Sequence, residues 1–121
     1  GNDRINLTVA NETVYGREGQ DTFVYDSWSA ADIDTIADFT IKGSDGNVDN
    51  SDLIDLSNLL DYKDGDDLTN YIDVSRDGSD NITIKIDSDG GSEFNTADQT
   101  IILQDIAAVI DHNAYENYII V

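Results

Sequence analysis

The sequence contains no cysteine, no proline and no methionine, and it has a single histidine, His112. The lack of cysteine excludes disulfides, zinc–thiolate sites, iron–sulfur clusters and thiol nucleophiles. One histidine excludes any metal site built from several imidazoles. The donors that remain are the oxygens of Asp, Asn, Glu, Ser, Thr and the backbone, and these hard ligands suit Ca²⁺ or Mg²⁺. Composition therefore indicates calcium as the cofactor.

Positive charge is also scarce. Six Lys and Arg stand against 26 Asp and Glu, which gives a formal net charge of −20 and a pI near 4.1. Such a chain repels phosphate backbones and anionic lipid, so we expect no nucleic-acid partner. No apolar run approaches the ~20 residues that a membrane helix needs, so we expect no direct membrane insertion. Twenty uncompensated charges also oppose compaction, which predicts a domain that needs divalent cations to fold.

The first 25 residues repeat with a period of nine. A small residue is followed two positions later by an acid, and two positions after that by an apolar residue. The three copies are Gly1-Asp3-Ile5, Ala10-Glu12-Val14 and Gly19-Asp21-Phe23. Glycine permits a tight turn, the acid is a cation ligand, and the apolar side chain points into a narrow core. Each copy is therefore interpreted as one turn followed by one short strand.

The period also predicts how these units are placed in space. If successive turns alternate between the two sides of a flattened coil, Asp3 and Asp21, eighteen residues apart, lie on the same side. One Ca²⁺ between those turns would take both carboxylates together with turn carbonyls at Gly1, Gly16 and Gly19. The middle copy has Ala10 and Glu12 in place of Gly and Asp, so we expect no good site there.

Residues 16–24, G-R-E-G-Q-D-T-F-V, resemble the RTX calcium-binding nonapeptide G-G-x-G-x-D-x-U-x, with Arg17 in place of its second glycine. Residues 34–39 (D-T-I-A-D-F) and 53–60 (L-I-D-L-S-N-L-L) resemble the segments that follow the last repeats of RTX exoproteins. Residues 84–91 and 100–106 extend the likeness. Nearly the whole chain is thus similar to the C-terminal secretion-target domain of large RTX adhesins exported by type I secretion systems.

The resemblance implies a mainly β fold, in which a short calcium-binding β-roll (residues 1–27) is capped by a small β-sandwich with one or two short helices (residues 28–121). It implies an uncleaved C-terminal export signal, so deletion of residues 101–121 should keep the parent protein inside the cell. The implied partners are an inner-membrane ABC transporter, its adaptor and an outer-membrane channel. The implied location is outside the cell or on the surface of a Gram-negative bacterium, as a monomer with a role in adhesion and biofilm.

No catalytic role is expected, because the chain lacks a G-x-S-x-G elbow or another nucleophile signature. Two alternatives stay open. One is a calcium-dependent adhesive or glycan-binding module, in which residues 87–91 or 45–52 present a bound ion to ligand hydroxyls. The other is the noncatalytic tail of a secreted RTX hydrolase.

Hydrophobic alternation predicts the remaining elements. Strands are expected over residues 37–41 and 54–56, a hairpin over residues 72–86, and further strands over residues 100–103 and 118–121. Ser57 is expected to cap a helical turn, and residues 103–112 have the spacing of a short helix.

Other acids are candidate ligands outside the repeats. Asp32, Asp34 and Asp38 follow the roll directly and are placed to close its last ion site. Asp87 and Asp89 precede Gly90-Gly91 and form a second candidate loop. The run that contains Asp61, Asp64, Asp66 and Asp67 is interpreted as a solvated charge cluster.

Overall fold

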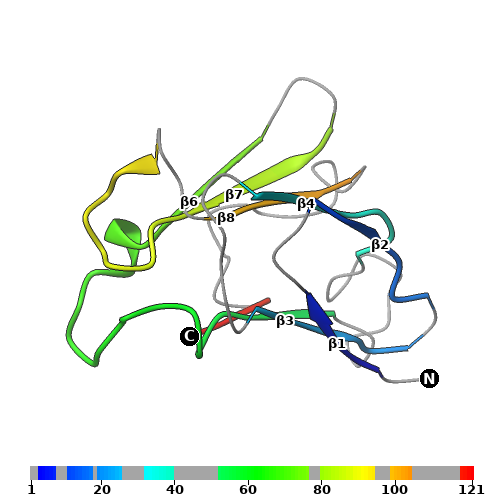
Figure 1. The fold of residues 1–121 in the computed structure, drawn as a ribbon, viewed down its shortest axis with the longest axis horizontal. Coiled ribbons are helices and arrows are strands. Elements are labelled where there is room, and N and C mark those ends of the chain that lie inside the picture. The colour runs from blue at the N-terminus through cyan, green and yellow to red at the C-terminus, as the bar shows by residue number, and fades with distance from the viewer. Residues whose placement is uncertain are drawn as a thin grey trace.

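A computed structural model describes residues 3–7, 11–17, 19–25, 32–39, 52–76, 80–94, 99–104 and 118–121. Two β-sheets lie face to face, and the first and last strands, β1 and β9, belong to the same sheet (Figure 1). The elements are β1 (Arg4–Leu7), β2 (Thr13–Val14), β3 (Thr22–Tyr25), β4 (Asp32–Ile36), β5 (Leu53–Asp55), the 3-10 helix η2 (Leu68–Asn70), β6 (Ile72–Arg76), β7 (Ile82–Ile86), β8 (Gln99–Leu103) and β9 (Ile119–Ile120).

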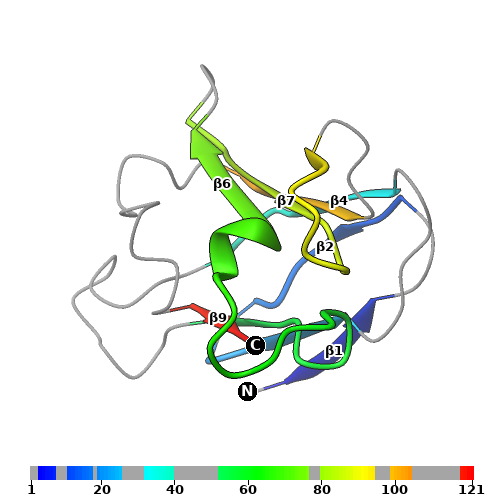
Figure 2. The same cartoon turned by 90° about the vertical axis from the view of Figure 1, so that its left-hand side faces the viewer.

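The first five strands alternate between the two sheets, so that the chain winds as a flattened coil. We call one strand from each sheet a coil, so that β1 and β2 form the first coil and β3 and β4 the second. One sheet has the order β1-β3-β5-β9, and all its neighbouring strands are parallel. The other has the order β2-β4-β8-β7-β6, in which β2, β4 and β8 are parallel while β7 runs antiparallel to both β8 and β6 (Figure 2). The predicted mainly β fold with a roll is therefore confirmed.

The register follows the period of nine. Arg4 pairs with Thr22 and Ile5 with Phe23, a separation of eighteen residues, which places Asp3 and Asp21 on the same side as predicted. On the other side Val14 pairs with Ile36, 22 residues later, because Ile36 follows Phe23 by thirteen residues rather than nine. Since side chains alternate along a strand, this register keeps the apolar residue of every repeat directed inward.

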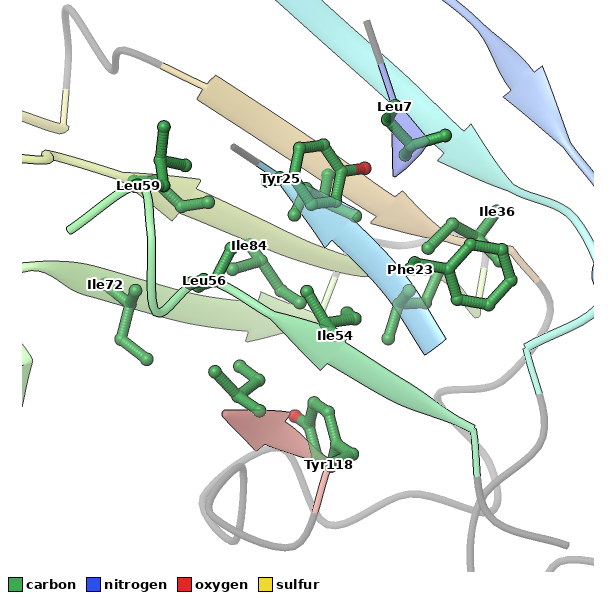
Figure 3. Close-up of a cluster of buried hydrophobic side chains, with 14 of the residues drawn as sticks. Leu7, Phe23, Tyr25, Ile36, Ile54, Leu56, Leu59, Ile72, Ile84 and Tyr118 are labelled. Atoms are coloured by element: carbon green, nitrogen blue, oxygen red, sulfur yellow. The ribbon is translucent and has the colours of Figure 1, made fainter. Parts of the chain in front are cut away.

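The core is the narrow space between the sheets. Phe23, Ile36, Ile54 and Ile84, from strands of both sheets, are each 0% exposed and point toward one another (Figure 3). Burial of a side chain of this size contributes roughly 1.5–3 kcal/mol. Phe23 also packs against Phe39, with ring centroids 6.1 Å apart. Isoleucine is β-branched and packs well on the inner, pleated face of a β-sheet.

The predicted hairpin is present. β6 pairs antiparallel with β7, with Val74 opposite Ile84, and Ile82, Ile84 and Ile86 are all fully buried. Asp80 precedes β7 with φ of 64°, a left-handed conformation that Asp tolerates better than most residues. The expected strands near residues 54, 100 and 119 are present as β5, β8 and β9.

Some expectations were wrong in detail. No strand begins at Ala37, because β4 ends at Ile36 and Ala37 and Asp38 form a turn. Ser57 does not cap the turn that follows β5; its amide and hydroxyl donate to Asp55 Oδ1, at 3.0 and 2.6 Å, so Asp55 is the cap. Leu103 is in β8, and most of the expected helix over residues 103–112 lies outside the described residues.

The predicted boundary at residue 27 lies outside the described residues and stays a prediction. β4, β5, β8 and β9 extend the same two sheets that the first three strands begin. Among the described residues, no helix is long and apolar enough to cross a membrane.

Candidate metal site and carboxylate ladder

Acids placed just before the strands of one sheet join successive coils of the roll. Asp21 Oδ1 accepts a hydrogen bond from the Asp3 amide at 2.9 Å, and Asp52 Oδ1 accepts one from the Asp21 amide, also at 2.9 Å. Backbone pairing between neighbouring strands begins at these positions, since the Thr22 amide donates to Asp3 O and the Leu53 amide to Asp21 O. Asp3, Asp21 and Asp52 therefore occupy equivalent positions in three coils.

Asp34, on the other side of the roll, and Asp38, on the same side as Asp21, repeat this arrangement. Asp34 Oδ1 accepts from the Glu12 amide at 3.0 Å, and Asp34 Oδ2 accepts from Gln99 Nε2 at 3.1 Å. Asp38 accepts from two amides at once, those of Gly16 and Arg17, each at 2.8 Å. In all four carboxylates the amide belongs to the preceding coil. We call this set, Asp21, Asp34, Asp38 and Asp52, the carboxylate ladder.

The ladder has a simple physical basis. Amides at the turns are not satisfied by strand pairing, and an unpaired buried amide costs about 1–3 kcal/mol. An Asp two residues before an inward apolar residue has the reach to accept such an amide. The triplet Asp-x-apolar recurs at Asp34-Thr35-Ile36 and Asp52-Leu53-Ile54, beyond the part of the sequence with a fixed period. This triplet is the signal that could have identified Asp52, which the repeat analysis missed.

Asp21 differs from the other ladder carboxylates in having one unsatisfied oxygen. Its side chain is 0% exposed, and Oδ2 is buried without any hydrogen-bond partner. This oxygen lies against Gly16, where a Cβ would come within 2.4 Å of it. Burial of a carboxylate oxygen without a donor or a cation carries a large desolvation cost. Asp21 Oδ2 is thus an unsatisfied acceptor packed against Gly16.

Backbone conformation in this turn supports the same interpretation of the motif. Gly19 has φ of 118°, which is accessible mainly to glycine. Arg17, which takes the place of the second motif glycine, adopts φ of 74° and is exposed. Arg17 therefore holds a left-handed conformation that costs a residue with a Cβ some backbone strain.

A divalent cation fits this turn only in part. An unsatisfied carboxylate oxygen is the donor type that Ca²⁺ prefers. However, the described residues contain no cluster of three acids that could hold a metal. Asp3 takes part in the ladder through its amide, and its side chain is exposed. Gly1 lies outside the described residues. Within the described part, Asp21 Oδ2 is the atom that a cation would satisfy.

Replacing Gly16 with Ala tests how tightly this turn is closed. The added Cβ would lie 2.4 Å from Asp21 Oδ2 and 3.1 Å from Phe23 Cζ. Because the Asp21 side chain is buried and held at Oδ1, it has little room to move, and we expect Gly16→Ala to destabilise the fold by about 1–3 kcal/mol in urea unfolding. In a chain that already carries Asp21→Ala, the Gly16→Ala substitution should lower the free energy of unfolding by distinctly less. An equal cost in both backgrounds would contradict the proposed contact.

The Asp87–Gly91 loop uses its carboxylates internally. Asp87 Oδ2 accepts from the Glu93 amide at 2.8 Å, and Asp87 Oδ1 lies 3.4 Å from the Asp89 amide. Asp89 Oδ1 in turn accepts from the Gly91 amide at 3.2 Å. The contacts in this second predicted loop are therefore those of a self-capped turn.

The predicted charge cluster at residues 61–67 is exposed but more ordered than a solvated run. The Tyr71 hydroxyl donates to Asp66 Oδ2 at 2.9 Å, and this bond is the main reason that the pKa of Tyr71 is raised to about 12. Asp67 Oδ1 accepts the Thr69 amide and caps η2. The Tyr71 ring also lies directly against Gly90, whose φ is 77°. These acids thus fix the loop between β5 and β6.

Two partly buried acids make the fold sensitive to low pH. Burial alone raises the pKa of Asp55, but hydrogen bonds from Ser57 and the charge of Arg4, 3.5 Å away, leave it below the ordinary value of 3.8. Burial likewise opposes the shift at Asp87, where hydrogen bonds from Asp89, Glu93 and Gly91 lower the pKa. A lowered folded-state pKa gives stability that is present above the unfolded value and lost as the pH falls through the folded value.

We therefore expect the urea midpoint to fall as the pH drops below about 4. General charge repulsion does not explain such a loss, because the net charge is small near the pI of 4.1. Asp87→Asn should start from a lower midpoint at neutral pH and show a shallower decline. Asp80→Asn, at an exposed position, should follow the parent curve. Parallel curves for the parent and Asp87→Asn would contradict the assignment.

Comparisons with known proteins address the fold. Neither a protein-family model nor a curated protein sequence matches the chain. Among solved structures, the AlgE6R3 subunit of the Azotobacter vinelandii mannuronan C5-epimerase is similar, with a TM-score of 0.62 and 24% sequence identity. The similarity covers 99% of this chain and 63% of that one. The fold is that of a β-roll module.

The described part of the roll contains all the candidate ligands except Gly1. Asp3, Gly16, Gly19 and Asp21 lie at one set of turns, and Gly16 is also bound through its amide to Asp38. Asp34 and Asp38 each use both carboxylate oxygens as hydrogen-bond acceptors. Asp32 is the first residue of β4. The structure therefore separates Asp21, with its unsatisfied oxygen, from the other candidate acids.

Proposed function

We propose that this chain is a noncatalytic, calcium-dependent β-roll module of a secreted bacterial protein, and that it folds after export by a type I secretion system. The observation that carries the calcium part is the buried, unsatisfied Oδ2 of Asp21. The export part rests on the sequence resemblance to RTX secretion-target domains. The parent protein is proposed to be an adhesin at the cell surface or in the medium.

Calcium would act on this chain in two ways. Bound at the Gly16–Asp21 turn, it supplies positive charge to a carboxylate oxygen that otherwise has no partner, with turn carbonyls as further ligands. It also offsets part of a net charge of −20 that opposes compaction. The remaining stabilisation comes from the hydrogen bonds of the carboxylate ladder and from the isoleucine-rich core.

The calcium affinity of such modules would let the chain stay unfolded inside the cell and fold outside it. Extracellular calcium modules have dissociation constants of about 10⁻⁴–10⁻³ M, so they stay empty where calcium is scarce. At about a hundredfold excess of calcium over the dissociation constant, one site contributes roughly 2.7 kcal/mol. That is a large part of the ~5–15 kcal/mol that stabilises an ordinary domain. A chain that is unfolded in the cytosol can be threaded through a channel, and folding outside would oppose its return.

A calcium titration of the chelated protein tests this proposal. We expect a cooperative increase of β-structure in far-UV circular dichroism at roughly millimolar Ca²⁺. Magnesium should not reproduce it, because Mg²⁺ requires strict octahedral geometry and dehydrates reluctantly. A chain that is already fully folded in chelator, with an unchanged urea midpoint on adding calcium, would overturn the calcium-dependent part of the proposal.

A second candidate, the tail of a secreted enzyme, is favoured by one comparison. The similar solved structure is a subunit of an epimerase, and this chain spans less than two thirds of it. The same module could therefore follow a catalytic domain in place of an adhesive one. Sequencing the intact protein recovered from the medium distinguishes the two, because a catalytic domain in the same polypeptide would favour the enzyme.

A further inference from the structure

A residue from the next coil holds the Gly16 turn against Asp21. Asp38, two residues after the end of β4, accepts the Gly16 amide at Oδ1 and the Arg17 amide at Oδ2, each at 2.8 Å. Gly16 in turn lies directly against Asp21 Oδ2, with no room for a Cβ between them. Asp38 is thus linked to the unsatisfied oxygen of Asp21 through Gly16, while both of its own oxygens accept amides.

Asp38 itself has a fixed place in the fold. The Ala37 amide donates to Val14 O at 2.9 Å, so the chain is already paired with the first coil one residue before Asp38. Phe39, one residue after it, is 5% exposed and packs against Phe23, with ring centroids 6.1 Å apart. A carboxylate that is held from both sides loses little further conformational entropy when it accepts two amides.

The two oxygens of Asp21 therefore depend on different coils. Oδ1 accepts the Asp3 amide of the coil before it, at 2.9 Å, whereas Oδ2 faces Gly16, whose backbone is bound by Asp38. A cation that satisfies Oδ2 has to fit beside this backbone. Arg17 adopts a left-handed φ of 74°, and the hydrogen bond from its amide to Asp38 offsets part of the strain of that conformation.

We infer that Asp38 is a positioning residue of the proposed calcium site: it sets the calcium affinity at Asp21 by holding the Gly16–Arg17 backbone in place, and it does not bind the ion. This inference rests on the proposed function of Asp21. Without Asp38, calcium binding would itself have to order the turn, and the entropy lost in doing so would weaken binding. Residues that fix the surroundings of a metal ligand have this effect in other metal sites.

The test compares Asp38→Ala with Asp67→Ala, a control that also removes one carboxylate that accepts a backbone amide. Asp67 accepts the Thr69 amide and caps η2, in the loop between β5 and β6. The calcium dissociation constant is obtained from the rise of the unfolding free energy in urea with Ca²⁺ concentration. A constant amount of trimethylamine N-oxide keeps the calcium-free chain folded. We expect Asp38→Ala to raise the dissociation constant by about tenfold and Asp67→Ala to leave it unchanged.

A purely structural role for Asp38 predicts a different result. Asp38→Ala would then lower the free energy of unfolding by the same amount at every calcium concentration, as Asp67→Ala should, and the dissociation constant would stay that of the parent. Complete loss of the calcium response would instead make Asp38 a ligand. Either result overturns the inference.

High salt separates position from charge. Loss of the Asp38 carboxylate also removes a negative charge that attracts the ion, but 1 M NaCl shortens the Debye length to about 3 Å and screens that attraction. The ratio of the dissociation constants of Asp38→Ala and the parent should therefore persist in 1 M NaCl, and a ratio that falls to one would overturn the positioning role. A parent chain without any calcium response would overturn the proposed function as well, whereas equal responses of parent and variant would overturn this inference alone.

Discussion

The Asp21→Asn variant is expected to lose the calcium response while staying at least as stable as the parent in chelator. Asn keeps an oxygen that accepts the Asp3 amide but removes a buried, partly unsatisfied negative charge. Without metal, loss of that charge is neutral or favourable. With calcium at about a hundred times its dissociation constant, the variant should forgo roughly 2.7 kcal/mol. Urea unfolding of both proteins with and without calcium measures this crossover.

Asp64→Asn is the matched control for that experiment. It removes the same charge from an exposed position. The variant should therefore keep the full calcium response, with at most a small gain in chelator from reduced repulsion. If Asp64→Asn weakens the response as much as Asp21→Asn, calcium acts through general screening, and a specific site at the Gly16–Asp21 turn is excluded.

Deletion of residues 101–121 is expected to block export from cells that carry a type I secretion system. The truncation also removes most of β8, which pairs with both β4 and β7, and all of β9. It should therefore unfold the remaining chain as well. The measurement is the amount of protein in the medium and in the cells, and undiminished export of the truncated chain would refute the signal.

A full-length variant separates loss of the signal from loss of the fold. Ile82 and Ile84 are both 0% exposed in the core and lie outside residues 101–121, so Ile82→Lys together with Ile84→Lys should prevent folding while the C-terminal segment stays unchanged. Because the proposed transport acts on unfolded chain, this variant should still leave the cell. Its retention, like that of the truncation, would show that folding rather than the C-terminal segment controls export.

The period of nine predicted the strand register in the first 25 residues correctly. The spacing of nine predicted alternation between sides, and the pairing of Ile5 with Phe23 confirms it. The prediction worked because neighbouring coils there have equal length, so that spacing in the sequence translates directly into register. Beyond Tyr25 the insertions between strands differ in length, and the same triplet recurs at Asp34 and Asp52 without a fixed period.

The roles of the acids were harder to predict. Asp34 and Asp38 are good calcium ligands by residue type, yet both bind amides of the preceding coil. Asp66 and Asp67 belong to an acidic run, yet one binds the Tyr71 hydroxyl and the other caps η2. A carboxylate accepts an amide as readily as it binds a cation, and only the neighbouring coil decides which partner is in reach.

The sequence by itself determined the chemistry and the local repeat of this protein: oxygen donors without thiols, strong negative charge, and an acid two residues before the inward apolar side chain of each repeat. The tertiary structure decided which acids remain available. It brought Asp52 beside Asp21 across 31 residues, satisfied most ladder oxygens with amides, and left Asp21 Oδ2 buried without a partner against Gly16. The reason is physical: hydrogen bonds between coils depend on which loops are inserted between strands, and local sequence patterns do not record that pairing.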